Sequence, residues 1–435
     1  MKKVFQLLLL SIVCLPLSAQ ENWVSYSQAI KTEGHEGRRF RLEAAVRAEI
    51  EDDSAATHLW ARVDKKSGFG FFENMSNRPI RSREWKTYTI EGKIDSGSYQ
   101  LAFGLWCQYN GTFFCDAVQL SIETEKGKWT TVLSDGFESV DLGKWKQGIQ
   151  RWEETGNGLN TLFQAASVTA NPFQGQRCLK IAGKNVPNYG MNKKAGKYLD
   201  VNGIRLYYES YGEGQPLVVL HTSGGSISEA TQFIPEWAKN HQVIAFDMRG
   251  HGNSSGRDTE PGYERMADDI AKALVQLKID SAYIWGFSDG ATIGLSLAVN
   301  HPRLVKKLLA GVPNILSDTT AVHSVIHQYL EKTANAPADS DQRKMSRWML
   351  SPSGLSFEKL AGIHCPVLLV TGDRDWVKLE HTLRIFQSIP QSQLSVIPGA
   401  THSSPWEKKD LFLQLATDFF DKPFKKPDTR DWFKE

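Results

Sequence analysis

The sequence predicts two structural classes in one chain: an all-β N-terminal part, followed by an α/β part with a mostly parallel sheet and helices on both faces. Up to residue 183, short alternating segments rich in aromatics are separated by turn residues, which is typical of a β sandwich. From residue 198, apolar runs alternate with helical stretches, which indicates a buried parallel sheet. The polar residues 184–197 between them are expected to form a linker.

The N-terminal domain, residues 21–183, is expected to contain strands that share alternating apolar residues and terminal turns. They are 39–48, 56–63, 85–92, 99–106 and 112–123. The last two flank the turn 108–111 and are predicted to form a hairpin. A symmetric hairpin would set Cys115 opposite Gly104 rather than Cys107, so this register disfavours a disulfide between the two cysteines.

The C-terminal domain, residues 198–425, is expected to alternate strands with helices, and residues 426–435 form a tail. The strands are predicted at 216–220, 243–246, 283–285, 367–370 and 394–397, and two of the helices at 267–278 and 291–299. A small cap is predicted over residues 317–360, with helices at 321–332 and 341–350.

Residues 1–20 have the features of a bacterial-type secretory signal peptide. Lys2 and Lys3 precede an apolar run, residues 4–17, which is short for a membrane span, and small residues for cleavage follow at 18–20. We therefore expect export to the periplasm or the extracellular space, with no membrane span after cleavage; a retained anchor is the alternative. The two lysines account for the formal charge of +2, so the mature chain is neutral and is not expected to bind nucleic acid.

The candidate nucleophile is Ser288, in the pentapeptide Gly286-Phe287-Ser288-Asp289-Gly290. This G-x-S-x-G motif follows a predicted strand and precedes a predicted helix, which is the context of a nucleophile elbow. The tight turn needs small neighbours, and the two glycines meet that need. The alternative is a serine that only caps the helix.

The candidate base is His402, which ends the loop Pro398-Gly399-Ala400-Thr401-His402 after the final strand. A serine hydroxyl needs such a base to become an effective nucleophile. The alternative is an ordinary surface histidine. With the elbow, this loop resembles the α/β-hydrolase superfamily, particularly its serine esterases, many of which place the base in a P-G-x-x-H loop.

The resemblance implies an acid between Ser288 and His402 in chain order. The turn that follows the strand 367–370 carries two aspartates, and the second, Asp375, matches the family's usual position. Asp373 is the competitor, with a turn-stabilising role as its alternative.

The resemblance also implies an oxyanion hole made by two backbone amides, those of Ser223 and Asp289. The loop 220–226 resembles the family's H-G-x-G-G segment, with Thr222 where glycine is usual. That departure puts the loop's backbone in question, because threonine resists positive φ. The alternative is a glycine-rich turn with no catalytic part. A further family segment, D-x-R-G-x-G-x-S at 247–254, is expected to be a structural turn bordering the site.

These residues predict an exported serine hydrolase that cleaves the carboxylic ester of a small acyl substrate through an acyl-enzyme, without metal or cofactor. Serine at the elbow, where relatives that cleave carbon–halogen bonds or epoxides carry aspartate, favours acyl substrates. The alternatives are lactone, amide or carbon–carbon cleavage on the same fold, or a sugar-binding protein with an inactive hydrolase half. Apolar cap residues are candidates to line an acyl pocket, with ordinary packing as the alternative: Val322, Val325, Ile326, Tyr329, Trp348 and Met349.

The N-terminal domain resembles the jelly-roll, carbohydrate-binding-type modules of secreted bacterial enzymes. The segments that carry the resemblance are 59–64, 73–80, 114–120, 136–139 and 175–181. Their order, with the apparent end before the apparent opening, predicts one jelly roll with permuted strands. Sugar contact would use exposed aromatic rings, and the candidates are Trp23, Trp60, Phe72, Trp85, Trp106 and Tyr109. The alternatives are core packing and docking on the hydrolase domain.

Overall fold

The chain divides into two compact units, one ending at Asn188 and the other running from Tyr189. The computed structural model describes residues 22–66, 69–148, 160–257, 262–336, 341–429 and 432. The predicted signal peptide and the last residues of the tail lie outside this part. No described helix is long and apolar enough to cross a membrane.

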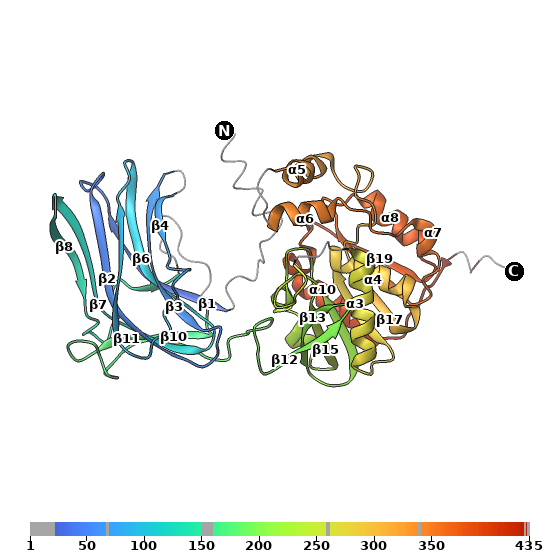
Figure 1. The fold of residues 1–435 in the computed structure, drawn as a ribbon, viewed down its shortest axis with the longest axis horizontal. Coiled ribbons are helices and arrows are strands. Elements are labelled where there is room, and N and C mark those ends of the chain that lie inside the picture. The colour runs from blue at the N-terminus through green and yellow to red at the C-terminus, as the bar shows by residue number, and fades with distance from the viewer. Residues whose placement is uncertain are drawn as a thin grey trace. The chain divides into compact units, whose positions relative to one another are not determined.

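The N-terminal unit consists of two antiparallel sheets around a common core (Figure 1). The first sheet has the order β4-β3-β6-β1-β9, and its strands are β1 (Trp23–Lys31), β3 (Ala56–Lys65), β4 (Phe69–Glu73), β6 (Ser98–Gln108) and β9 (Lys146–Gln147). The second has the order β10-β11-β7-β2-β5, with β8 paired to β7, and its strands are β2 (Arg39–Ile50), β5 (Lys86–Lys93), β7 (Gly111–Glu125), β8 (Lys128–Asp135), β10 (Phe163–Val168) and β11 (Cys178–Gly183). The predicted all-β class of this part is confirmed.

The predicted hairpin between 99–106 and 112–123 is wrong. The strands exist, but β6 pairs with β1 and β3 in one sheet, whereas β7 pairs with β2, β8 and β11 in the other. The short connection passes between the sheets at Tyr109, whose amide donates to Asn22 O at 2.8 Å. Both strands turn apolar faces to the same core from opposite sides, so pairing them would have left one sheet without its inner face. Cys107 and Cys115 are buried free thiols. Because the hairpin does not form, its predicted register gives no argument about a disulfide between them.

The segment after residue 130 completes the two sheets. Its strand β11 pairs with β7, and β9 pairs with β1. Trp145, Phe163 and Ile181 belong to the same hydrophobic core as the earlier strands. The permuted jelly-roll topology stays a prediction.

The C-terminal unit is built on an eight-stranded sheet with the order β12-β13-β15-β14-β16-β17-β18-β19. The strands are β12 (Gly196–Val201), β13 (Ile204–Tyr211), β14 (Gln215–Leu220), β15 (His241–Asp247), β16 (Ala282–Phe287), β17 (Val305–Gly311), β18 (Val367–Gly372) and β19 (Ser392–Ile397). The first two junctions are antiparallel and the others are parallel. The predicted, mostly parallel α/β class is confirmed.

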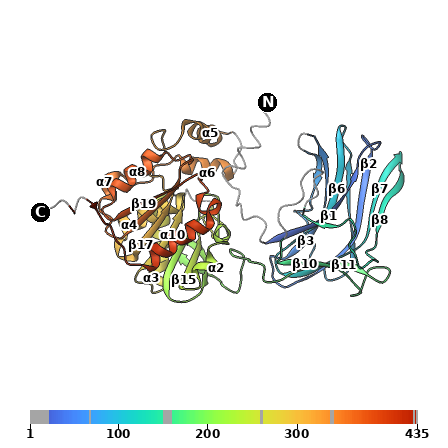
Figure 2. The ribbon, with the colours of Figure 1, turned by 180° about the vertical axis from the view of Figure 1, so that it is seen from behind.

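Helices cover both faces of this sheet (Figures 1 and 2). One face packs against α3 (Tyr263–Gln276), α4 (Asp289–Asn300) and α8 (Leu379–Ser388). The other packs against η1 (Ile227–Ala230), α2 (Ile234–Trp237) and α10 (Lys409–Asp421). The remaining elements are η2 (Pro302–Leu304), α5 (Ser324–Ala334), α6 (Asp341–Met349), α7 (Phe357–Leu360) and α9 (Ser404–Glu407). Parallel strands buried on both faces must be apolar throughout, which explains runs such as Leu217–Leu220.

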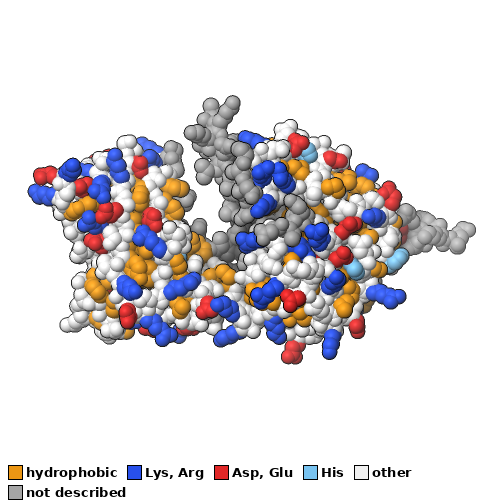
Figure 3. All heavy atoms as spheres, viewed as in Figure 1, with side chains coloured by type: hydrophobic (Ala, Val, Ile, Leu, Met, Phe, Trp, Pro, Cys, Tyr) orange, Lys and Arg blue, Asp and Glu red, His pale blue; other side chains and the backbone are white. Residues whose placement is uncertain are grey.

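Where the chain enters the C-terminal unit, a buried carboxylate binds its backbone amides. Glu209 of β13 is fully buried and accepts the amides of Gly190 at 2.7 Å and Asn192 at 2.8 Å. It also accepts the hydroxyls of Tyr207 and Tyr211, at 2.8 and 2.7 Å. The middle of the predicted linker is therefore fixed to the sheet. Basic and acidic side chains are interspersed over the visible face of each unit (Figure 3).

Candidate active site

Ser288 lies between β16 and α4 in a strained backbone conformation, with φ 53° and ψ −116°. Its amide donates to Gly311 O of β17 at 2.7 Å, and the residue is 7% exposed. A non-glycine residue at positive φ is uncommon and indicates that the surroundings hold it there. The turn therefore presents the hydroxyl at the carboxyl end of the sheet.

The two glycines of the motif make this turn possible. A Cβ at Gly286 would lie 2.2 Å from Gly290 O, and one at Gly290 would lie 2.3 Å from Leu220 O. Backbone atoms cannot yield as a side chain does, so neither position has room for a methyl group. The motif thus reflects close packing of α4 against β14 and β16.

Ser288, His402 and Asp375 form a hydrogen-bonded relay. His402 Nε2 lies 3.1 Å from Ser288 Oγ, and His402 Nδ1 lies 2.9 Å from Asp375 Oδ1. The carboxylate can only accept, so the proton of the neutral imidazole is on Nδ1 and Nε2 accepts from the serine. Val377 N donates to Asp375 Oδ1 at 2.8 Å, which fixes the carboxylate at the end of β18.

Asp373, the competing acid, has a different place. Its Oδ1 accepts the amide of Gly399 at 2.9 Å in an exposed turn. This bond joins the turn after β18 to the loop that carries His402. The geometry therefore favours Asp375 as the partner of the imidazole and gives Asp373 a turn-stabilising contact.

The loop predicted to hold the oxyanion follows β14. Ser223 is buried, and the positive φ of the loop, 71°, falls on Gly224 rather than on Thr222. The threonine is therefore accommodated without the strain that its position suggested. The other predicted donor, the amide of Asp289, opens α4, where helical amides have no acceptor within the helix.

His221 holds the start of this loop as a neutral side chain. Its Nε2 accepts the amide of Met248 at 2.9 Å, so the ring proton is on Nδ1 and is donated to Thr222 O at 2.6 Å. Burial, aided by the neighbouring His251, lowers the pKa of His221 to about 3. An uncharged ring at neutral pH keeps both bonds in place.

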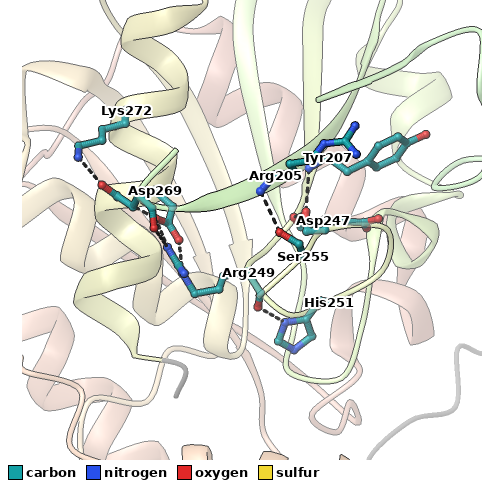
Figure 4. A network of polar contacts seen from close by, with 10 residues as sticks. Arg205, Tyr207, Asp247, Arg249, His251, Ser255, Asp269 and Lys272 are labelled. Carbon is teal, nitrogen blue, oxygen red and sulfur yellow. Dashed lines mark hydrogen bonds and ion pairs between the residues drawn. The ribbon is translucent and has the colours of Figure 1, made fainter. Parts of the chain in front are cut away.

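The segment 247–254 forms a turn, and Figure 4 shows its residues Asp247, Arg249 and His251. It lies beside the oxyanion loop, because the His251 ring is 5.1 Å from that of His221. Asp247 Oδ1 accepts the amide of Ile227, and its Oδ2 accepts that of Asn253. Burial raises the pKa of Asp247 to about 6. Arg249 forms two bonds with Asp269 of α3, and the segment thereby joins the sheet, α3 and the oxyanion loop.

Aromatic residues of α3 and α6 connect to Asp289, the residue after the nucleophile. Trp348 of α6 packs against Tyr263 and His251, with ring centroids 5.4 and 5.5 Å apart. Tyr263 donates its hydroxyl to Asp289 Oδ1 at 2.6 Å, and burial raises the pKa of that tyrosine. The Asp289 side chain, which sequence reasoning left without a role, therefore places a buried carboxylate next to Ser288.

The predicted pocket-lining residues are divided between core and surface. Val322 and Trp348 are buried in the two cores of the unit, whereas Val325 is 60% exposed. Ile326, Tyr329 and Met349 are half-buried. The acyl pocket they were expected to form stays a prediction. In the described part of the chain, no group of His, Cys, Asp and Glu side chains could hold a metal ion.

Sequence reasoning missed Glu229, which approaches the oxyanion loop from η1. Its carboxyl oxygen Oε2 accepts the amide of Thr222 at 3.1 Å. No motif marks this residue. The one signal in the sequence that could have pointed to Glu229 is its position a few residues after the glycines of the oxyanion loop.

Comparisons with known proteins agree with this architecture. The family model of the alpha/beta hydrolase fold matches residues 215–320. The mouse (Mus musculus) protein "Serine hydrolase BPHL" is 25% identical over 286 residues, which are 59% of this chain and 96% of that protein. A "2-hydroxymuconate semialdehyde hydrolase" of Pseudomonas sp. (strain CF600) is 35% identical over 119 residues, covering 26% of this chain and 42% of that protein.

Solved structures also match part of this chain. A meta-cleavage product hydrolase from Pseudomonas fluorescens IP01 covers 53% of this chain and 99% of its own, with 21% identity and a TM-score of 0.46. The order of the sheet, the elbow and the family model lead to the same conclusion: this chain is a hydrolase with the α/β-hydrolase fold.

Proposed function

We propose that this hydrolase cleaves a carboxylic ester through an acyl-enzyme formed on Ser288. The observation that carries the proposal is the continuous relay from Ser288 Oγ through His402 to Asp375, at 3.1 and 2.9 Å. Each distance is within hydrogen-bond reach, which general base catalysis requires. The proposed substrate is a small molecule with an ester carbonyl.

In this mechanism His402 accepts the proton of Ser288 as the oxygen attacks the carbonyl. Asp375 holds the imidazole in the tautomer with its proton on Nδ1 and stabilises the imidazolium that forms. The amides of Ser223 and Asp289 donate to the oxyanion. His402 then protonates the leaving alcohol, and a water molecule repeats the sequence to release the acid.

The test is activity-based labelling beside turnover of p-nitrophenyl esters. We expect a fluorophosphonate probe to label the wild type, and Ser288→Ala to lose labelling and roughly 10³-fold or more of kcat. Ser388→Ala, on the surface of α8, is the matched control and should behave as wild type. A wild type that neither reacts with the probe nor hydrolyses any substrate would support an inactive hydrolase half.

Cleavage of a different bond is the second candidate, favoured by the named relative that acts as a 2-hydroxymuconate semialdehyde hydrolase. The same relay serves lactone, amide and carbon–carbon substrates. Turnover of esters should therefore be compared with that of lactones, anilides and 2-hydroxymuconate semialdehyde. A preference of tenfold or more in kcat/KM for the last would replace the ester proposal.

Export is a separate proposal that rests on residues 1–20. Cell fractionation and N-terminal sequencing should find a periplasmic or secreted form that begins near residue 21.

Sugar contact by the N-terminal unit also stays a prediction: Trp60 is buried, Trp23 packs on Trp106 at 5.2 Å, and Phe72 is 47% exposed. A pull-down with insoluble polysaccharides would test it.

A further inference from the structure

The carboxyl group of Glu229 contacts the segment 222–225, which carries the Ser223 amide. Its Oε2 accepts the amide of Thr222 at 3.1 Å. On the far side of Ser223, Gly225 packs so closely that an added Cβ would lie 2.1 Å from Glu229 Oε1. The carboxyl group therefore supports the loop on both sides of the proposed oxyanion donor.

The backbone of Glu229 is itself fixed to the rest of the site. Its carbonyl oxygen accepts the indole Nε1 of Trp406 at 3.1 Å. Trp406 packs edge-on against Phe287 at 4.7 Å, and Phe287 lies 5.3 Å from the His402 ring. Glu229 thus joins the oxyanion loop to the loop that carries the base.

The surroundings of this carboxyl group favour its uncharged form. Burial raises the pKa of Glu229 to about 8, against the lowering effect of the Thr222 amide, and the negative charge of Asp289 on α4 raises it further. The oxyanion loop contributes the neutral His221, and α9 contributes the uncharged indole of Trp406. Among the described residues no cation pairs with Glu229.

The charge matters because the transition state of acyl transfer places a negative charge at the oxyanion. Preorganised donors stabilise that charge most strongly in a low-dielectric site that excludes water, and each further negative charge nearby works against them. A protonated carboxyl still accepts the Thr222 amide through its carbonyl oxygen. An ionised one would keep that bond but would repel the developing oxyanion.

We propose that Glu229 is a positioning residue of the oxyanion loop, whose carboxyl group holds the backbone on both sides of Ser223 in place. This inference rests on the proposed acyl transfer at Ser288. It assigns to Glu229 no contact with the substrate.

The experiment compares Glu229→Ala, Glu229→Gln and wild type across pH 6 to 10. We expect Glu229→Ala to lose about 10- to 100-fold in kcat with a smaller change in KM, because a misplaced donor costs part of the 10²- to 10³-fold that a missing one does. Glutamine offers the same acceptor without a charge and should restore most of that loss. Wild-type kcat should decline as the pH rises through about 8, and Glu229→Gln should lack this decline.

Glu236→Gln is the matched control, since Glu236 is an exposed carboxylate paired with Lys239. It should leave both kcat and its pH dependence unchanged. Circular dichroism establishes that each variant is folded, and the pH profile of Glu229→Gln decides the question even where the alanine variant does not fold.

A folded Glu229→Ala with kcat within threefold of wild type would overturn the inference. So would an alkaline decline that persists in Glu229→Gln. Failure of the wild type to react with a fluorophosphonate would overturn the proposed function and this inference with it. Normal labelling of the wild type with an unimpaired Glu229→Ala would overturn the inference alone.

Discussion

The buried ion pair of Arg249 and Asp269 provides a quantitative test of how the turn beside the active site is held. The guanidinium donates to both carboxylate oxygens, at 2.7 and 2.8 Å, and the two side chains are 3% and 1% exposed. Arg249→Met removes the cation and leaves an uncompensated buried carboxylate. Such a change destabilises a protein by about 3–5 kcal/mol.

This loss should be visible as a shift of one thermal transition. For a unit that runs from Tyr189 to Glu435, each kcal/mol lowers Tm by about 2–4 °C. We therefore expect Arg249→Met to lower the Tm of the hydrolase unit by roughly 6–20 °C in differential scanning calorimetry. The transition of the N-terminal unit should stay in place and serve as an internal reference.

Two controls separate the buried pair from charge effects in general. Lys239→Ala breaks an exposed pair with Glu236, whose side chains are 63% and 44% exposed, and should change stability by less than about 1 kcal/mol. Arg249→Met combined with Asp269→Leu removes both charges and should recover most of the loss. A Tm decrease under about 2 °C for Arg249→Met, or a double variant no more stable than the single one, would refute the reasoning.

Two further predictions concern the elbow and the effect of acid. Gly290→Ala should lower kcat by about 100-fold or more, because its Cβ would lie 2.3 Å from Leu220 O and must displace the nucleophile. Gly362→Ala, whose Cβ would lie 3.4 Å from its nearest neighbour, is the control. Equal kinetics for the two variants would contradict the packing argument. Burial lowers the pKa of His381 to about 4. Between pH 6.5 and 4 the unfolded chain therefore binds more protons than the folded chain, and the wild type loses stability as the pH falls. The loss amounts to about 2 kcal/mol at pH 5. His381→Gln, which keeps an acceptor for the Ile315 amide, should lose correspondingly less between pH 7.5 and 5 in urea unfolding, and an equal loss would exclude His381 as the source.

The residues of the relay could be predicted from sequence because each sits at a strand end. Ser288, Asp375 and His402 follow β16, β18 and β19, and these strands are apolar runs that can be recognised locally. Parallel strands bring their carboxyl ends to one edge, so three positions distant in the chain meet there. The structure brings the three side chains together.

Strand partners could not be predicted in the same way. Residues 99–106 and 112–123 have the alternation and the turn of a hairpin, and both segments are strands. Which strand pairs with which depends on the whole core, however, and β7 pairs along its length with β2 from far earlier in the chain. Local pattern fixes that a segment is extended and which face is apolar, but not the sheet that it joins.

Two glutamates that bind backbone amides, Glu209 and Glu229, show the same limit at the level of single residues. Alternation along β13 places Tyr207, Glu209 and Tyr211 on one face, and a glutamate in such a pattern would ordinarily face solvent. Glu209 is fully buried because the linker folds back over it and supplies two amides. Glu229 has a comparable position, because its carboxyl group accepts the amide of Thr222 and lies against Gly225. In both cases backbone groups, which carry no sequence signature, create the site, so a glutamate whose function depends on them can be found only once the path of the chain is known.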